Sequence, residues 1–240
     1  MTEALFRKDA YQTECEAEIV AINDRGGIVL DRTVLYPTGG GQPGDSGTLT
    51  WDGGSCAIAV AVKGDTPDEV VHVPEADAQA PAVGTTVKVL LNWDLRHRHM
   101  RVHTALHLLS VVIPLPVTGG SISAEKGRLD FDMPEAPQDK EALEAELNAL
   151  IAADHPVSDE WITDAELEAK PEMVKTMSVK PPMGQGHVRL VRIGADAGNP
   201  IDLQPCGGTH VRSTGEIGPV RLGKIEKKGK QNRRVSVHID

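Results

Sequence analysis

The sequence predicts an α+β protein in which a small antiparallel β domain precedes a domain of mixed helices and strands. Three observations support this fold class. Short alternating segments fill residues 1–90, helical periodicity first appears after residue 91, and alternation returns towards the C-terminus. We therefore expect two domains, 1–90 and 91–240, within the 240-residue chain.

The first domain contains a series of short apolar or alternating segments separated by glycine, proline and aspartate. This spacing is typical of a small antiparallel barrel or sandwich. The intervening stretch PEADAQAPAVG, residues 74–84, is expected to be a surface loop. The expected strands lie within residues 14–24, 28–37, 47–54, 56–64, 69–74 and 85–92.

The second domain begins with a predicted helix over residues 94–113, which Pro114 ends, and continues with an amphipathic helix within residues 138–156. Thr163 and Glu166 have the spacing of a capping box that opens a further helix. Residues 187–194 are expected to form a strand, and residues 217–240 a hairpin that turns near Gly229. The inward-facing positions are Met100, Leu106, Leu109 and Ile113 in the first helix and Leu143, Leu147, Leu150 and Ile151 in the second.

The formal net charge of −10 does not exclude a nucleic-acid partner. Residues 135–172 contain 12 acidic against 2 basic side chains, so this segment accounts for the whole excess and a local basic face remains possible elsewhere. No segment approaches the roughly 20 apolar residues of a membrane helix, and the start is too charged for a secretory signal. Three cysteines give no disulfide framework. We expect a soluble cytoplasmic protein.

Two pairs of metal-binding side chains stand about a hundred residues apart. His103 and His107 have the i, i+4 spacing that places both on one helix face, although helix-surface or core histidines have this spacing too. Cys206 and His210 bracket Gly-Gly-Thr, which by itself is equally an ordinary turn. Together the pairs offer the four nitrogen and sulfur ligands that zinc prefers, so we predict one Zn²⁺ per chain. Thr104 follows His103 where a helical zinc peptidase carries glutamate, which argues against peptidase chemistry.

Four stretches of the sequence stand out: HTALHLL (103–109), QPCGGTHV (204–211), LDRTVLYPTGGGQPGDSGTL (30–49) and KGKQNRRV (228–235). Together they resemble the editing domain of alanyl-tRNA synthetases and its freestanding trans-editing relatives. The resemblance implies a β-barrel-like first domain that carries a glycine-rich loop, followed by a zinc-containing α+β editing domain. No stretch looks like an ATP-binding aminoacylation core, so the chain resembles the freestanding proteins. Leu35 stands where the family commonly has phenylalanine, which should alter packing under the loop.

The resemblance implies a zinc-dependent aminoacyl-tRNA deacylase that needs neither ATP nor a membrane. Its substrate would be the acceptor end of mischarged tRNA(Ala), chiefly Ser-tRNA(Ala) and as a second candidate Gly-tRNA(Ala), with zinc positioning substrate and water. In the glycine-rich loop, Gly40 and Gly41 can present N–H groups to an oxyanion, Gln42 offers a donor and an acceptor, and Thr38 can read the serine hydroxyl. A solvent turn between strands is the alternative for this loop.

Basic side chains are the candidates for holding the acceptor stem, because phosphate contacts position RNA without reading its bases. A solvated charged face is the alternative. Asp130 is a candidate for orienting a ligand histidine, and a strand-surface acid is the equal alternative. The candidate tRNA-binding residues are Arg96, Arg98, Arg101, Thr209, Lys224, Lys227, Lys228, Lys230, Arg233 and Arg234.

Two other functions are compatible with the same residues. An RNA-binding module with a structural zinc would show no turnover for a zinc-site variant to lose. A zinc hydrolase of a small ester or amide would cleave free esters and show no preference for charged tRNA, and the basic C-terminal segment argues mildly against it.

Overall fold

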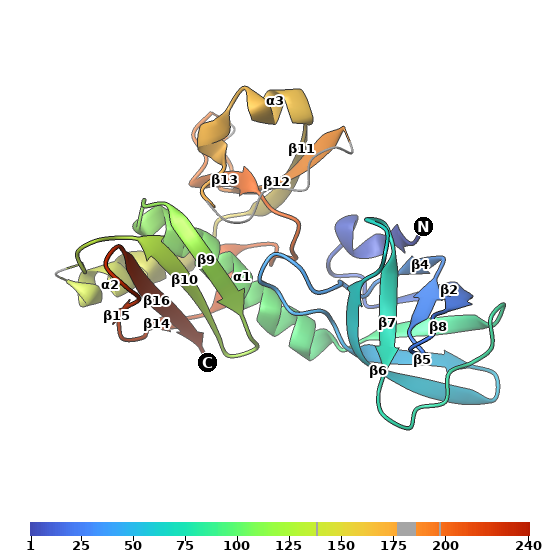
Figure 1. Cartoon of the computed structure of the whole chain (residues 1–240). Coiled ribbons are helices and arrows are strands. Elements are labelled where there is room, and N and C mark those ends of the chain that lie inside the picture. The colour runs from blue at the N-terminus through green and yellow to red at the C-terminus, as the bar shows by residue number, and fades with distance from the viewer. Residues whose placement is uncertain (138, 177–185, 197) are drawn as a thin grey trace. The chain divides into compact units, whose positions relative to one another are not determined.

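The computed structural model describes residues 1–137, 139–176, 186–196 and 198–240. The chain forms two compact units, Met1–His97 and Arg98–Asp240 (Figure 1). The predicted α+β class is confirmed, including a closed antiparallel barrel. The boundary expected at residue 91 lies just before helix α1 (Trp93–Val112), and the division between the units falls within this helix. In the described part of the chain, no helix is long and apolar enough to cross a bilayer.

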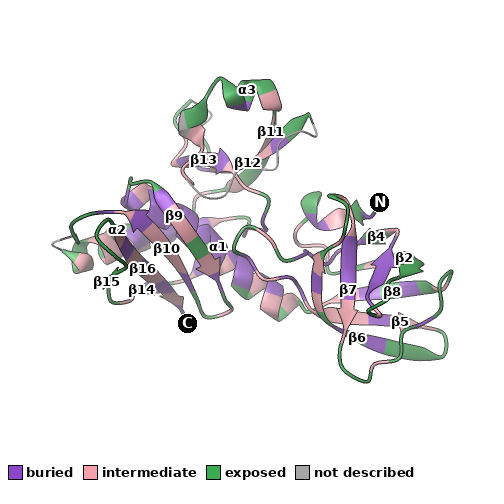
Figure 2. Cartoon of the chain, viewed as in Figure 1, coloured by how far each residue is buried: buried purple, intermediate pink, exposed green. Residues whose placement is uncertain are grey.

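The first unit is built around a closed six-stranded barrel with strand order β2-β3-β7-β6-β5-β8. Figure 2 shows both buried and exposed segments on the strands of this unit. Alternation explains the core, since Ala17 and Ile19 of β2 are buried while their neighbours are exposed. Leu35 is fully buried in the same core. Outside the barrel, β1 (Glu3–Ala4) pairs in parallel with β4 (Arg32–Thr33), and a 3₁₀ turn, η1, covers Leu5–Arg7. The barrel strands are β2 (Glu14–Ile22), β3 (Ile28–Leu30), β5 (Gly47–Trp51), β6 (Gly54–Lys63), β7 (Val70–Pro74) and β8 (Thr86–Leu91).

Helix α1 carries the first pair of predicted metal ligands. The side chain of Asn92 accepts a hydrogen bond from Leu95 N at 3.3 Å at the start of the helix, and Pro114 follows its end. A Cβ at Gly127 of β10 would lie 2.6 Å from Val102 and 2.9 Å from Leu106, so glycine permits close contact between α1 and the sheet. The four predicted apolar positions, Met100, Leu106, Leu109 and Ile113, are all buried, which confirms the helical pattern.

The second unit contains two antiparallel sheets. The larger has the order β14-β16-β10-β9, with β15 also paired to β16, and it confirms the predicted C-terminal hairpin. Asn148 of α2 bonds to both backbone groups of Val220 at 2.9 Å, which holds this amphipathic helix against β14. The strands are β9 (Val117–Ile122), β10 (Lys126–Asp132), β14 (Val220–Leu222), β15 (Glu226–Lys227) and β16 (Asn232–Ile239), and the helix is α2 (Lys140–Ala152).

The smaller sheet, β11-β12-β13, leads directly into the second pair of predicted ligands. Strand β11 was not among the elements expected from the sequence. The predicted capping box of Thr163 and Glu166 is confirmed at the start of α3. The elements of this region are β11 (Val157–Thr163), α3 (Asp164–Glu168), η2 (Pro171–Met173), β12 (His187–Ile193), β13 (Asp202–Pro205) and η3 (Thr214–Ile217).

Candidate metal centre

His103 and His107 lie one turn apart on the same face of α1, with ring centroids 5.3 Å apart. Both are buried, at 8% and 6% exposure. A helix holds two such side chains in fixed relative positions without help from any other element. The helical half of the predicted site is therefore a rigid feature of α1.

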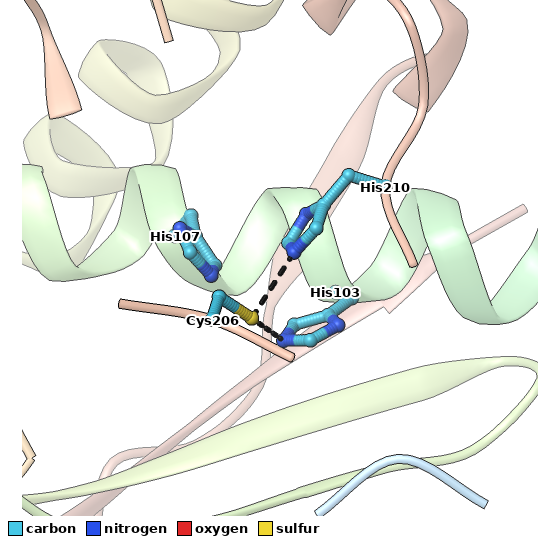
Figure 3. Close-up of side chains that lie close together, drawn as sticks. All are labelled: His103, His107, Cys206 and His210. Carbon is cyan, nitrogen blue, oxygen red and sulfur yellow. Dashed lines mark hydrogen bonds between the residues drawn. The ribbon is translucent and has the colours of Figure 1, made fainter. Parts of the chain in front are cut away.

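Cys206 follows the last residue of β13, and His210 lies four residues further along the loop. The Cys206 sulfur is 3.5 Å from His103 Nε2 and 3.3 Å from His210 Nε2 (Figure 3). One ligand atom from each of the four residues lies within 4.8 Å of all the others. A tetrahedral zinc ion with bonds of about 2.3 Å to sulfur and about 2.1 Å to nitrogen holds such atoms about 3.6 Å apart. The four donors therefore fit zinc in chemistry and in spacing.

Hydrogen bonds at Nδ1 orient two of the three imidazoles. His107 Nδ1 lies 2.9 Å from an oxygen of Asp202, and His210 Nδ1 lies 3.1 Å from the Thr104 hydroxyl. That hydroxyl donates to Met100 O, so it accepts the proton of His210 Nδ1. Both rings then carry their proton on Nδ1, which leaves Nε2 as the ligand atom.

Asp202 is itself held by several partners. Its other oxygen accepts from Lys175 Nζ at 2.6 Å, and Gln204 Nε2 donates to the oxygen that faces His107 at 2.7 Å. Burial would raise the pKa of Asp202, but His107 and Lys175 lower it to about 2. This carboxylate is therefore ionised over the whole physiological range and acts as a fixed acceptor for His107.

The donor set itself favours a positive charge at its centre. Burial would raise the pKa of the Cys206 thiol, yet neighbouring His103 and His210 hold it well below its usual value. Burial also works against a charged His107, whereas Asp202 and Cys206 raise its pKa to about 9. Burial and the charge of His103 lower the pKa of His210 well below its usual value. A thiolate surrounded by imidazoles is the environment that a divalent cation satisfies.

Asp202, Gln204 and Lys175 were not among the residues singled out in the sequence. The signal for two of them was present: Asp202 and Gln204 alternate along β13 and share a face, and Cys206 continues the same period directly after the strand. Asp130, the predicted orienting acid, lies on β10, where it pairs with Arg234 at 2.7 Å and Arg128 at 2.6 Å. Both arginines lower its pKa, and the hydrogen bond from Arg234 is the largest single cause. The structure thus brings Asp202, and not Asp130, to a ligand histidine.

The glycine-rich loop lies in the first unit as a tight turn. Gly39 and Gln42 exchange both backbone hydrogen bonds at 3.0 Å, and Gly40 and Gly41 between them have φ of +58° and +85°. This is the type I′ geometry, which favours glycine at both central positions. Thr38 is exposed and its hydroxyl accepts from Gly44 N at 2.9 Å, whereas Gln42 is 1% exposed.

A buried ion pair between Asp45 and Arg96 lies at the end of the glycine-rich loop. Asp45 accepts from Tyr36 N at 2.5 Å and from Arg96 Nε, and both charged side chains are at most 1% exposed. Arg96 also donates to Val34 O at 2.7 Å and Ala10 O at 2.9 Å. Its guanidinium is engaged inside the first unit, so we leave Arg96 out of the proposed tRNA-binding surface.

The remaining candidate tRNA-binding residues differ in exposure. Arg101 Nε donates to Ile217 O at 2.9 Å, Arg233 is 9% exposed and bonds to Pro134 O, and Arg234 pairs with Asp130. Thr209 is 1% exposed. The exposed members of the set are Arg98, Lys224, Lys227, Lys228 and Lys230.

Comparison with known proteins gives consistent results at both ends of the chain. Residues 188–236 match the family described as the threonyl and alanyl tRNA synthetase second additional domain, and residues 3–95 match class II (A) tRNA synthetases. The alanyl-tRNA editing protein AlaX-M of Methanosarcina acetivorans is 36% identical over 98% of each chain. AlaX-L of Pyrococcus horikoshii is 34% identical over 98% of this chain and 57% of its own length. The alanine–tRNA ligase of Pyrobaculum arsenaticum is 33% identical over 94% of this chain and 25% of its own length. Because the match to AlaX-M extends over practically the full length of both proteins, the chain belongs to the alanyl-tRNA editing protein family.

Proposed function

We propose that this protein is a trans-editing hydrolase that cleaves the aminoacyl ester of mischarged tRNA(Ala), chiefly Ser-tRNA(Ala), with Gly-tRNA(Ala) as a second substrate. The full-length similarity to proteins named alanyl-tRNA editing proteins supports the substrate class. The observation that carries the proposal is the convergence of His103, His107, Cys206 and His210, which come from a helix and from a distant loop.

In this proposal the four side chains hold one zinc ion. The chemistry that zinc supplies when bound is Lewis-acid polarisation of oxygen. The chain's own contribution is to fix the donors: Asp202 and Thr104 retain the Nδ1 protons of His107 and His210, and Cys206 remains a thiolate. Cys206 is therefore a ligand and does not act as a nucleophile.

We assign substrate recognition to the glycine-rich loop. Gly40 and Gly41, at the exposed tip of the turn, are suited to present backbone N–H groups to developing negative charge. The Thr38 hydroxyl donates to Ala61 O at 3.4 Å and uses one of its two lone pairs to accept from Gly44 N, so one lone pair remains for a substrate hydroxyl. Gln42, being buried, supports the loop from within. The exposed basic residues Arg98, Lys228 and Lys230 are the proposed phosphate contacts.

The test is hydrolysis of Ser-, Gly- and Ala-tRNA(Ala) by the intact protein, with and without a zinc chelator. We expect release of serine but not of alanine, and loss of this release on chelation or in Cys206→Ser. Intact Ser-tRNA(Ala) after prolonged incubation would exclude the editing activity. Equal cleavage of a free amino-acid ester and of charged tRNA would favour a small-ester hydrolase instead.

A further inference from the structure

Arg189 of β12 lies beside the loop that carries two of the four metal ligands. Its register partner on β11 is Trp161. Arg189 O also accepts a hydrogen bond from Cys206 N at 3.1 Å, which joins β12 to the start of the loop. The Arg189 side chain is 10% exposed, which is unusual burial for a guanidinium and requires specific partners.

The partners of this guanidinium are backbone atoms of the metal loop. Nη1 donates to Cys206 O at 2.9 Å and to Gly208 O at 2.8 Å, and Nη2 donates to Asp159 Oδ1 at 2.7 Å. One planar group thereby spans from β11 to two carbonyls that flank Gly207. Because an arginine fork has rigid geometry, these contacts fix the positions of both carbonyls relative to the sheet.

The loop benefits from such an anchor because two consecutive residues after Cys206 have no side chain to hold the backbone. Cys206 is followed by Gly207 and Gly208, and a Cβ at Gly207 would meet no heavy atom within 4 Å. Two consecutive glycines have the largest conformational freedom of any dipeptide, so the thiolate would be poorly placed without an external contact. His103 and His107 are held by α1 and do not have this problem.

We propose that Arg189 is the positioning residue of the metal loop: it holds the Cys206–Gly208 backbone so that the sulfur meets the three imidazoles, and it thereby sets the affinity for zinc. This inference rests on the proposed zinc site and deepens it. Groups that orient metal ligands in this way typically contribute a factor of about 10 to 100 in metal affinity.

The chain contains a matched control on the same strand. Arg192 also pairs across the strands with a β11 carboxylate, Glu160, and its side chain is 11% exposed. Arg192 Nη1 also donates to Asp196 O at 3.2 Å. Arg189→Met and Arg192→Met therefore remove similarly buried guanidinium groups that each pair with a β11 carboxylate, and Arg189→Met in addition removes the two hydrogen bonds to Cys206 O and Gly208 O.

The experiment measures the zinc dissociation constant of the full chain by competition with a chromogenic chelator, with the Tm of the zinc-free protein in parallel. We expect Arg189→Met to weaken zinc binding about 10- to 100-fold and Arg189→Lys to weaken it to a lesser degree, because one ammonium cannot replace the fork. Arg192→Met should leave zinc affinity within twofold of wild type, even if both methionine variants lower the Tm of the zinc-free protein.

The outcomes separate this inference from the zinc proposal itself. Unchanged zinc affinity in Arg189→Met would overturn the role of Arg189 while leaving the metal site intact. An equal loss of zinc affinity in Arg192→Met would also overturn the role of Arg189, since the loss would then reflect the general stability of the strand. A wild-type protein that binds no zinc would overturn both the metal site and the positioning role.

Discussion

At the scale of single residues, Asp202 is the acid on which the metal centre most depends. We expect Asp202→Asn to weaken zinc affinity about 10- to 100-fold, because the amide removes the charge that retains the Nδ1 proton of His107. Asp130→Asn is the control: Asp130 of β10 pairs with Arg128 of the same strand and with Arg234 of β16, so zinc affinity should not change. Chelator competition on both variants measures the difference. A larger loss in the Asp130 variant would contradict this assignment.

His72 gives the barrel a dependence on pH. It is fully buried, with Nδ1 3.0 Å from Ile28 O and Nε2 2.8 Å from the Thr33 hydroxyl, and burial lowers its pKa from 6.5 to about 4. Between these values the unfolded chain binds a proton and the folded chain does not, so stability present above pH 6.5 is lost as the pH falls towards 4. The loss amounts to about 3 kcal/mol.

Urea denaturation between pH 7 and pH 4 measures this effect. The free energy of unfolding of the wild-type protein should fall over that range. His72→Gln should be less stable than wild type at pH 7, but its free energy of unfolding should fall less between pH 7 and pH 4 because it lacks the titration of His72. If the free energies of unfolding of the two proteins fell in parallel with pH, His72 would not titrate as its burial requires.

At the scale of elements, the Asp45–Arg96 pair holds the start of α1 against the glycine-rich loop within the first unit. Removing one member of a buried ion pair leaves the other charge without compensation, so we expect Arg96→Met to cost about 3 to 5 kcal/mol. Arg96→Met combined with Asp45→Asn should be less destabilised than the sum of the single variants. Denaturant unfolding of all three gives the coupling, and strict additivity would argue against the pair.

The turn of the glycine-rich loop should respond differently at two of its glycines. A Cβ at Gly40 would meet no atom within 4 Å. Gly40→Ala should therefore lower the stability only by the cost of holding alanine in the left-handed conformation, about 1 to 2 kcal/mol. A Cβ at Gly44 would lie 1.9 Å from Ala61 O, so Gly44→Ala must displace the backbone and should cost more. Thermal unfolding of the two variants tests this order. A larger loss of stability in Gly40→Ala than in Gly44→Ala would contradict it.

At the scale of the whole molecule, the metal ligands join segments 103 residues apart in the sequence. Zinc that binds only the folded chain stabilises it, so chelation should lower the Tm of the protein. Calorimetry with and without chelator measures this shift, and Cys206→Ser should show a much smaller one. A Tm independent of chelator in the wild-type protein would mean that the four donors hold no metal.

The sequence predicted much of this architecture for physical reasons that act locally. Alternation along the barrel strands and the helical spacing of Met100, Leu106 and Leu109 follow from burial of one face, and both were confirmed. Strand β11 was missed because its alternation is weak: Trp161 is 54% exposed and most of its neighbours are polar. Such a short polar strand forms because it pairs with β12, and the residue pattern of one segment does not show which other segment it pairs with.

The cluster of His103, His107, Cys206 and His210 could be predicted because two local spacings, each weak alone, gain specificity together. Their supporting residues could not, because support depends on which segments meet in space. Asp202, Lys175 and Arg189 come from different parts of the chain, and only the packing of β12 and β13 near α1 gives each its role. For the same reason Arg96, in a basic run of sequence, proved to be a buried partner of Asp45.

The division of the ligands between a helix and a later loop has a consequence for biosynthesis. At a translation rate of about 5 to 20 residues per second, the two α1 histidines emerge roughly 5 to 20 s before the cysteine and the third histidine exist. During that interval the nascent polypeptide carries only a bidentate imidazole pair, which binds copper or nickel as readily as zinc. At the proposed zinc site, any selectivity that depends on the thiolate therefore begins only when Cys206 has been synthesised.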